Sequence, residues 1–164
     1  MSARFKNLLF LLLSAVLTYL IHDEMVRWMD GKQVVAFEML KTEAATNALL
    51  SSAEWQQPDA NSLTKVDKLR QNTYWDFLYI LGYTFTLFFF ARTLLGSSHK
   101  RLKTMALLLL VAGLSDAIEN VLLLQILDGS RGFFPAAMYG FAWLKFGALG
   151  VFLGWVGVEV VRGK

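Results

Sequence analysis

Four long runs of apolar residues, separated by polar stretches, dominate the pattern along the chain. Three of them, at about 74–95, 104–127 and 136–160, have the roughly twenty residues that a helix needs to cross the hydrocarbon core of a bilayer. The first run, at about 5–22, is shorter, and a secretory signal peptide is the alternative to a membrane helix. No clear small-x-small cleavage site follows this run, which favours an uncleaved helix. The pattern therefore predicts four transmembrane helices.

A polar segment at about 30–73 separates the first two apolar runs, and its spacing predicts a helical hairpin. Asp30 begins a pattern that resembles a capping box, and apolar residues then recur at helical intervals until Pro58. Asn61 or Ser62 is expected to cap the next helix, which continues without a breaker into the second apolar run. The hairpin is either a cap packed on the bundle or on a neighbouring subunit, or a ligand-sensing element.

Length and composition restrict the fold class further. The 164 residues suit one domain, taken here as 1–164, and 55% of them are hydrophobic while 18% are charged. Soluble domains carry roughly 25% charged residues, so this composition requires lipid as a solvent. The expected fold is all-α: an integral membrane four-helix bundle with an extracytoplasmic helical hairpin between helices 1 and 2.

The net charge of +3 does not indicate nucleic-acid binding, because no nucleic-acid motif accompanies the basic residues. The basic residues cluster at the ends of the apolar runs, and their distribution gives the orientation in the membrane. One side carries only basic residues, which the positive-inside rule places in the cytoplasm together with both termini. These residues are Arg4, Lys6, Arg92, Lys100, Arg101, Lys103, Arg162 and Lys164. The other side carries most of the acidic residues, namely Asp23, Glu24, Asp30, Glu38, Glu43, Glu54, Asp59 and Asp67.

The third apolar run contains an unusual polar group. Asp116, Glu119 and Asn120 are spaced so that they share one face of a helix. An ionised aspartate near the bilayer centre costs on the order of 2.5 to 3.5 kcal/mol, so these side chains should face the bundle interior and have a partner. Lys145 lies at a matching depth in the fourth run and is the best candidate partner for Glu119 or Asp116.

Weaker polar stripes on the other helices could meet this group in a pocket open to the outside. The second run carries Asp76, Tyr79 and Tyr83, followed by Thr86. The first run carries Asn7, Ser14, Thr18 and His22. The alternative is a buried ion-pair and hydrogen-bond network that fixes the helix register and binds no ligand. We predict no metal site, because His22, Asp23 and Glu24 are adjacent on a helix and point in different directions.

The fourth run carries a glycine seam on the side nearly opposite Lys145. The seam consists of Gly140, Gly147, Gly150, Gly154 and Gly157. Such residues let helix backbones approach closely in lipid. The seam is expected to contact the first helix, and contact with another copy of the chain is the alternative. Glu159, near the end of this run, is expected to pair with Arg162, Lys164 or Arg92.

The segment from Gly113, with Asp116, Glu119 and Asn120, resembles a stretch in small uncharacterised bacterial multi-pass membrane proteins, in which an Asp-x-x-Glu-Asn pattern lies in a transmembrane helix. The resemblance covers about a dozen residues and brings no activity with it. It implies a bacterial inner membrane as the location and emphasises these three polar side chains.

Three functions are compatible with this pattern. The first is a binding or transport protein in which the polar group handles a proton, a cation or a small polar ligand. The second is an oligomerising scaffold, accessory subunit or small pore, a homo-oligomer or part of a larger membrane complex, that uses the seam and the hairpin. The third is an intramembrane enzyme acting on a lipid-borne substrate. No catalytic residue is assigned and no cofactor is expected: the chain has no cysteine and no recognisable catalytic or phosphate-binding motif.

Overall fold

The structure is a computed structural model that describes residues 3–96 and 101–162. Lys100 and Lys164, two of the basic residues assigned to the cytoplasmic side, lie outside the described residues. Over the described ranges the chain forms seven α-helices and no β-strand. The all-α fold class is therefore confirmed.

Four helices are long and apolar enough to cross a membrane, as the hydropathy pattern predicted. They are α1 (Ala3–Trp28), α5 (Lys65–Leu95), α6 (Leu102–Leu127) and α7 (Phe134–Val161). Helix α1 continues beyond the predicted end at residue 22. Its last turns are stabilised because Arg27 pairs with Asp23 at 2.8 Å and with Glu24 at 3.0 Å, at the spacings that favour a helix.

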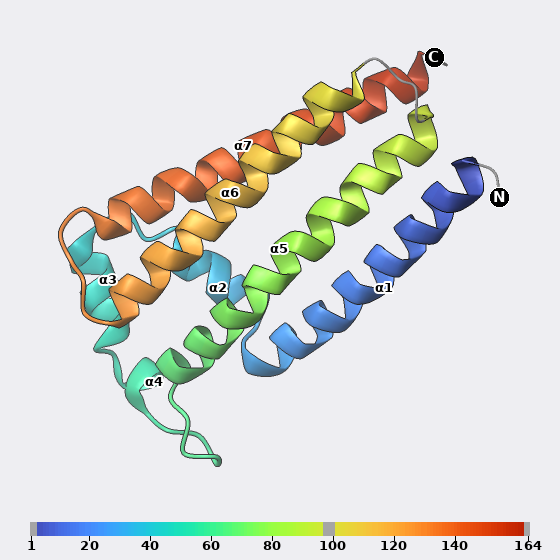
Figure 1. The fold of residues 1–164 in the computed structure, drawn as a ribbon. Coiled ribbons are helices and arrows are strands. Elements are labelled where there is room, and N and C mark those ends of the chain that lie inside the picture. Colours follow the sequence, from blue (N-terminus) through green and yellow to red (C-terminus); the bar gives the residue numbers. More distant parts are fainter. Residues whose placement is uncertain (1–2, 97–100, 163–164) are drawn as a thin grey trace.

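The long helices lie side by side in the order α1, α5, α6, α7 (Figure 1). Helix α1 packs along α5, α5 along α6, and α6 along α7, whereas α1 and α7 do not pack along each other. Both chain ends lie at the same end of the molecule, which we call the terminal end (Figure 1). The short helices lie at the other end, which we call the short-helix end. The row of helices therefore leaves α1 and α7 apart.

The segment between α1 and α5 differs from the predicted hairpin. The single helix expected before Pro58 is divided into α2 (Gly31–Glu38), α3 (Glu43–Leu50) and α4 (Ala53–Gln56). Asp30 does cap α2, by accepting a hydrogen bond from the backbone of Lys32, and Thr42 starts α3 in the same way. Helices α2 and α3 pack against α7, and α4 packs against α5. These short helices thus pack on two of the long helices, α5 and α7.

The cap of α5 also differs from the prediction at Asn61 or Ser62. Thr64 caps this helix in a full capping box with Asp67. The preceding turn is closed by Asp59, which accepts bonds from the backbone of Asn61 and Leu63. Asp59 also pairs with Lys68 at 2.7 Å, and this contact lowers the pKa of the Asp59 carboxyl.

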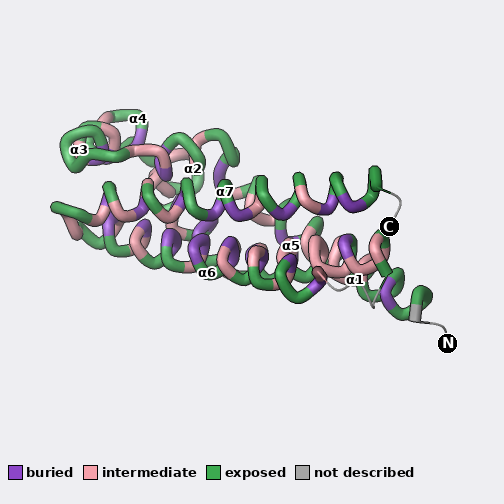
Figure 2. The backbone as a smooth tube through the Cα atoms, turned by 90° about the horizontal axis from the view of Figure 1, so that it is seen from above, coloured by how far each residue is buried: buried purple, intermediate pink, exposed green. Residues whose placement is uncertain are grey.

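Two apolar clusters hold the fold together and leave a polar layer between them. At the short-helix end, Phe37 and Trp55 pack with residues from the ends of α5, α6 and α7. At the terminal end, Met105 and Phe152 belong to a second cluster, which joins α5, α6 and α7. Figure 2 shows buried positions along α6 and α7, whereas most of α1 is exposed. The exposed apolar side chains of α1 suit contact with lipid.

Candidate functional site

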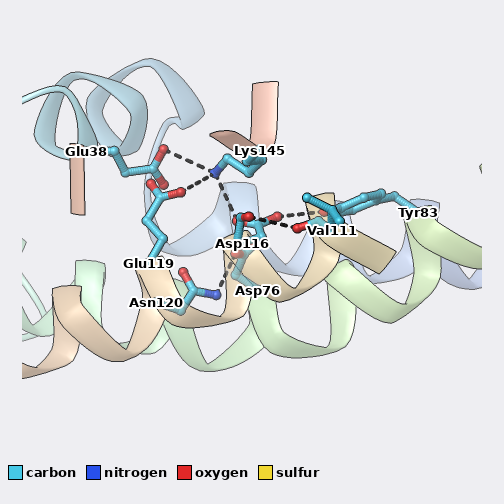
Figure 3. Close-up of polar contacts among 9 residues, drawn as sticks. Glu38, Asp76, Tyr83, Val111, Asp116, Glu119, Asn120 and Lys145 are labelled. Atoms are coloured by element: carbon cyan, nitrogen blue, oxygen red, sulfur yellow. Dashed lines mark hydrogen bonds and ion pairs between the residues drawn. The ribbon is translucent and has the colours of Figure 1, made fainter. Parts of the chain in front are cut away.

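Lys145 on α7 is the centre of a buried ionic cluster. Its Nζ atom lies 2.9 Å from an oxygen of Asp116 and 2.9 Å from an oxygen of Glu119, both on α6 (Figure 3). A third carboxyl group, that of Glu38 at the end of α2, lies 3.6 Å from the same nitrogen. All four side chains are buried. The contact between the third and fourth spans expected from their matching depths is therefore present.

Hydrogen bonds join α5 to this cluster. The Tyr83 hydroxyl donates to the second carboxyl oxygen of Asp116 at 2.9 Å. One turn away, the Asn120 amide donates to Asp76 at 2.7 Å (Figure 3). Asp116 thus accepts from Lys145 through one oxygen and from Tyr83 through the other. The polar layer links α2, α5, α6 and α7 in one network.

The network forms one wall of a cavity of about 580 Å³ between the two outer helices of the row. This volume lies within the range of roughly 300–1,000 Å³ typical of small-molecule sites. Five helices contribute to it: α1, α2, α5, α6 and α7. Its polar lining includes Thr18, His22, Glu38, Asn72, Thr73, Asp76, Tyr79, Tyr83, Thr86, Asp116, Asn120 and Lys145.

Most of the polar residues singled out from the sequence meet at this cavity. Asp76, Tyr79 and Tyr83 line it, as do Thr18 and His22 from α1. Glu119 does not: its side chain is fully buried behind Lys145. Asn7 and Ser14 lie elsewhere on α1 and are not part of the lining. Helix α2 contributes Gly31, Val34, Val35 and Glu38 to the lining.

Glu38 is a site residue that the sequence pattern did not reveal. It was counted among the acidic residues of the predicted extracytoplasmic side, yet it is 5% exposed and reaches Lys145. A signal was present, because Glu38 follows Val34 by four residues and so shares the face of α2 that carries apolar side chains. A carboxyl group on the inward face of a helix marks a buried polar contact.

The charges of the site do not balance. Four carboxyl groups, those of Glu38, Asp76, Asp116 and Glu119, lie in the layer with the single ammonium group of Lys145. Buried like charges raise one another's energy, and removal from water adds to the cost. Protons or a bound cation must therefore neutralise the excess negative charge. Within the described ranges, no three His, Cys, Asp or Glu side chains are placed to hold a metal ion.

The glycine seam lies outside this site. Each of its five glycines is exposed, and an added Cβ atom at any of them would meet nothing within 4 Å. The expectation that the seam contacts the first helix is therefore wrong, since α1 packs along α5 instead. Glu159 pairs with Arg101, which was not among its expected partners, and the Trp155 indole donates to the same carboxyl group at 3.3 Å. One of the expected partners, Lys164, lies outside the described residues.

No family model matches the chain, and no curated protein and no solved structure is significantly similar to it. The fold and the geometry of the site therefore carry the functional argument alone. They define a multi-pass helical membrane protein with a buried ionic cluster beside a cavity.

Proposed function

We propose that the protein is a binding or transport protein of the bacterial inner membrane that takes a small cationic ligand into the cavity between α1 and α7. One observation carries the proposal. Three carboxyl groups line the cavity, those of Glu38, Asp76 and Asp116. Among the described residues the only ammonium group in the lining is that of Lys145, which is already in contact with three carboxyl groups. The uncompensated charge favours a cation over an anion.

Aromatic rings along the cavity suit an organic cation. Tyr79 lies between His22 and Tyr83, with ring centroids 5.9 Å and 5.7 Å apart. The faces of tyrosine rings attract ammonium groups when these are partly desolvated. The carboxyl group of Asp76 lies one turn from Tyr79 on the same face of α5. Charge and rings together support a ligand with an amine or ammonium group.

The test is to titrate the full chain in nanodiscs with sodium, potassium, methylammonium and longer alkylammonium ions and to measure binding by calorimetry. At least one cation is expected to bind, with an affinity that rises with pH because protons compete for the same carboxyl groups. The Asp76→Asn variant should bind at least tenfold more weakly. Asp23→Asn, which alters an exposed carboxyl group of α1 away from the cavity, serves as the control. If no cation of the panel binds the unaltered protein, the proposal is wrong.

A second candidate function, assembly with other copies of the chain, is favoured by the free face of α7. Five glycines on that face have open space in front of them, which leaves room for a second helix to approach closely. The double variant Gly150→Leu and Gly154→Leu should then lower the number of copies per complex in native mass spectrometry. An unaltered protein that is strictly monomeric in nanodiscs and in mild detergent would exclude this assembly.

A further inference from the structure

The cavity is elongated along the helix axes, and it is partly open on the side between α1 and α7. Its lining on α5 extends from Asn72 to Leu87, a distance of about 22 Å at the rise of an α-helix. Helices α1 and α7 form its two sides without packing along each other. The lining residues at these sides include Val26 on α1, which is 52% exposed, and Phe146 on α7, which is 40% exposed. The opening between α1 and α7 thus has an apolar rim.

The part of this rim at Phe146 faces hydrocarbon and not water, because Phe146 lies well inside the apolar run of α7. Val26 lies in the last turns of α1, between Glu24 and Arg27 and beyond the apolar run at 5–22. Both residues belong to helices that are long and apolar enough to span a membrane. Side chains exposed on such helices contact lipid chains unless another protein covers them. A molecule that enters beside Phe146 therefore comes from the bilayer.

The polarity of the cavity changes along its length. Acidic groups line the half nearer to the short-helix end, where Glu38 and Asp76 lie. The half nearer to the terminal end contains Leu87 and Leu149, whereas Phe146 lies at the level of Lys145. The hydroxyl groups in that half are satisfied: those of Thr18 and Thr86 lie 3.0 Å apart and bond to each other, and that of Tyr83 donates to Asp116. One end of the cavity thus suits a charged group and the other an aliphatic chain.

An unsatisfied acceptor marks the charged end. The side chain of Asn72 is held by a hydrogen bond of 2.9 Å from its amide nitrogen to the carbonyl oxygen of Met25. The other atom of this amide, Oδ1, is buried and has no hydrogen-bond partner in the described part of the chain. Asn72 is only 2% exposed, lines the cavity and precedes Asp76 by one helical turn. Both side chains offer acceptors, so the complementary group is a donor with a positive charge.

We propose that the ligand is an amphiphile with a protonated amine head group and a single aliphatic chain, which enters from the lipid between α1 and α7. Its head group lies against Asn72 and Asp76, beside the ring of Tyr79. Its chain extends toward Leu87 and Leu149. This inference rests on the proposed function, because it assigns a chemical class to the cation and a route to the site.

The experiment compares three probes on the full chain in nanodiscs, with nanodiscs lacking protein as the blank. Dodecylammonium has both head group and chain, methylammonium has the head group alone, and dodecyl sulfate has the chain with the opposite charge. Dodecylammonium is expected to bind at least tenfold more tightly than either of the others. Equal binding of methylammonium would overturn the inference and leave the proposed function standing. Binding of none of the three would overturn the inference and leave the sodium and potassium titrations to decide the proposed function, and equal binding of dodecyl sulfate would overturn the choice of a cation.

The route is tested by narrowing the opening. Val26→Trp places a large ring at the apolar rim and should slow the association of dodecylammonium at least fivefold in stopped-flow fluorescence. Val16→Trp is the matched control, because Val16 is also on α1, is 57% exposed and does not line the cavity. Equal association rates in the two variants would show that the ligand does not enter between α1 and α7. The comparison of probes needs no variant, so it remains decisive if a variant fails to fold.

Discussion

Lys145 is the residue on which the polar layer depends. Its ammonium group contacts carboxyl groups that come from two other helices, Asp116 and Glu119 from α6 and Glu38 from α2. The ammonium group offsets the repulsion among these carboxyl groups and part of their desolvation cost. A buried charge that loses its partner has no water to replace it.

We therefore predict that Lys145→Met destabilises the fold by about 3–5 kcal/mol, the cost typical of leaving one side of a buried ion pair alone. Methionine fills a volume similar to that of lysine, so the loss of stability reports the missing charge and not a change in packing. The measurement is reversible unfolding in mixed micelles with increasing dodecyl sulfate, followed by circular dichroism.

Lys103→Met provides the control for this substitution. Lys103 lies on the exposed surface of α6 near the terminal end, and its replacement should change the unfolding free energy by less than about 0.5 kcal/mol. Similar values for the two variants would show that the carboxyl groups do not need the ammonium group. Restoration of stability by a second substitution, Glu119→Gln, would show that the cost arises from the unpaired carboxyl groups.

For single residues, the sequence reveals which charged side chains lie at equal depths in adjacent spans and can therefore pair. Asp116, Glu119 and Lys145 could be matched because membrane depth follows from residue position along a helix. Glu38 could not be matched, because it lies in a short helix whose fold-back toward α7 depends on packing between distant parts of the chain. Asn72 could not be recognised either, since an amide without a partner is visible only once its surroundings are known.

At the scale of the helices, α1 and α5 approach each other closely at Gly82. A Cβ atom added there would lie 2.7 Å from the Thr18 hydroxyl oxygen and 3.3 Å from the Thr18 Cα atom. Threonine has a stiff, branched side chain, and the Thr18 hydroxyl already bonds to Thr86 and to the carbonyl oxygen of Ser14. The contact can therefore be relieved only by moving the helices apart.

Gly82→Ala is accordingly expected to destabilise the fold by about 1–3 kcal/mol, the usual cost of overpacking. Gly147→Ala on α7 is the matched control. A Cβ atom there meets nothing within 4 Å, so the higher helix propensity of alanine should leave stability unchanged or raise it by up to about 1 kcal/mol. Thermal unfolding of both variants in the same detergent measures the difference. A Gly82→Ala variant as stable as the control would show that α1 is not tightly packed on α5.

Element by element, hydropathy predicts the existence of the four spans because lipid requires about twenty apolar residues in a helix. It does not predict the breaks after Glu38 and Leu50, where the helical pattern continues in the sequence. Those breaks arise from local competition: the side chains of Thr42 and Ser51 bond to nearby backbone groups. Nor does a glycine pattern show which glycines are in contact, since the seam on α7 is free while Gly82 is buried.

For the molecule as a whole, the order of the helices decides whether a cavity exists. A closed bundle would bring α1 against α7 and bury the space between them. The observed row keeps them apart, so the faces of α5 and α6 between them are left to line a cavity. Hydropathy contains no information about which spans are neighbours, because every span is apolar on its lipid side. The site therefore follows from the arrangement as much as from the residues.

The same arrangement places both chain ends together, which makes orientation testable with two reporters (Figure 1). Basic residues gather at the terminal end, among them Arg4, Arg92 and Arg101, and each gains about 1 kcal/mol near an anionic cytoplasmic surface. We predict that green fluorescent protein fused at either terminus fluoresces, because it folds in the cytoplasm. Alkaline phosphatase inserted after the exposed Ala60 should be active, because it folds outside. Phosphatase activity at the C-terminal fusion, with none after Ala60, would reverse the orientation and place the acidic end in the cytoplasm.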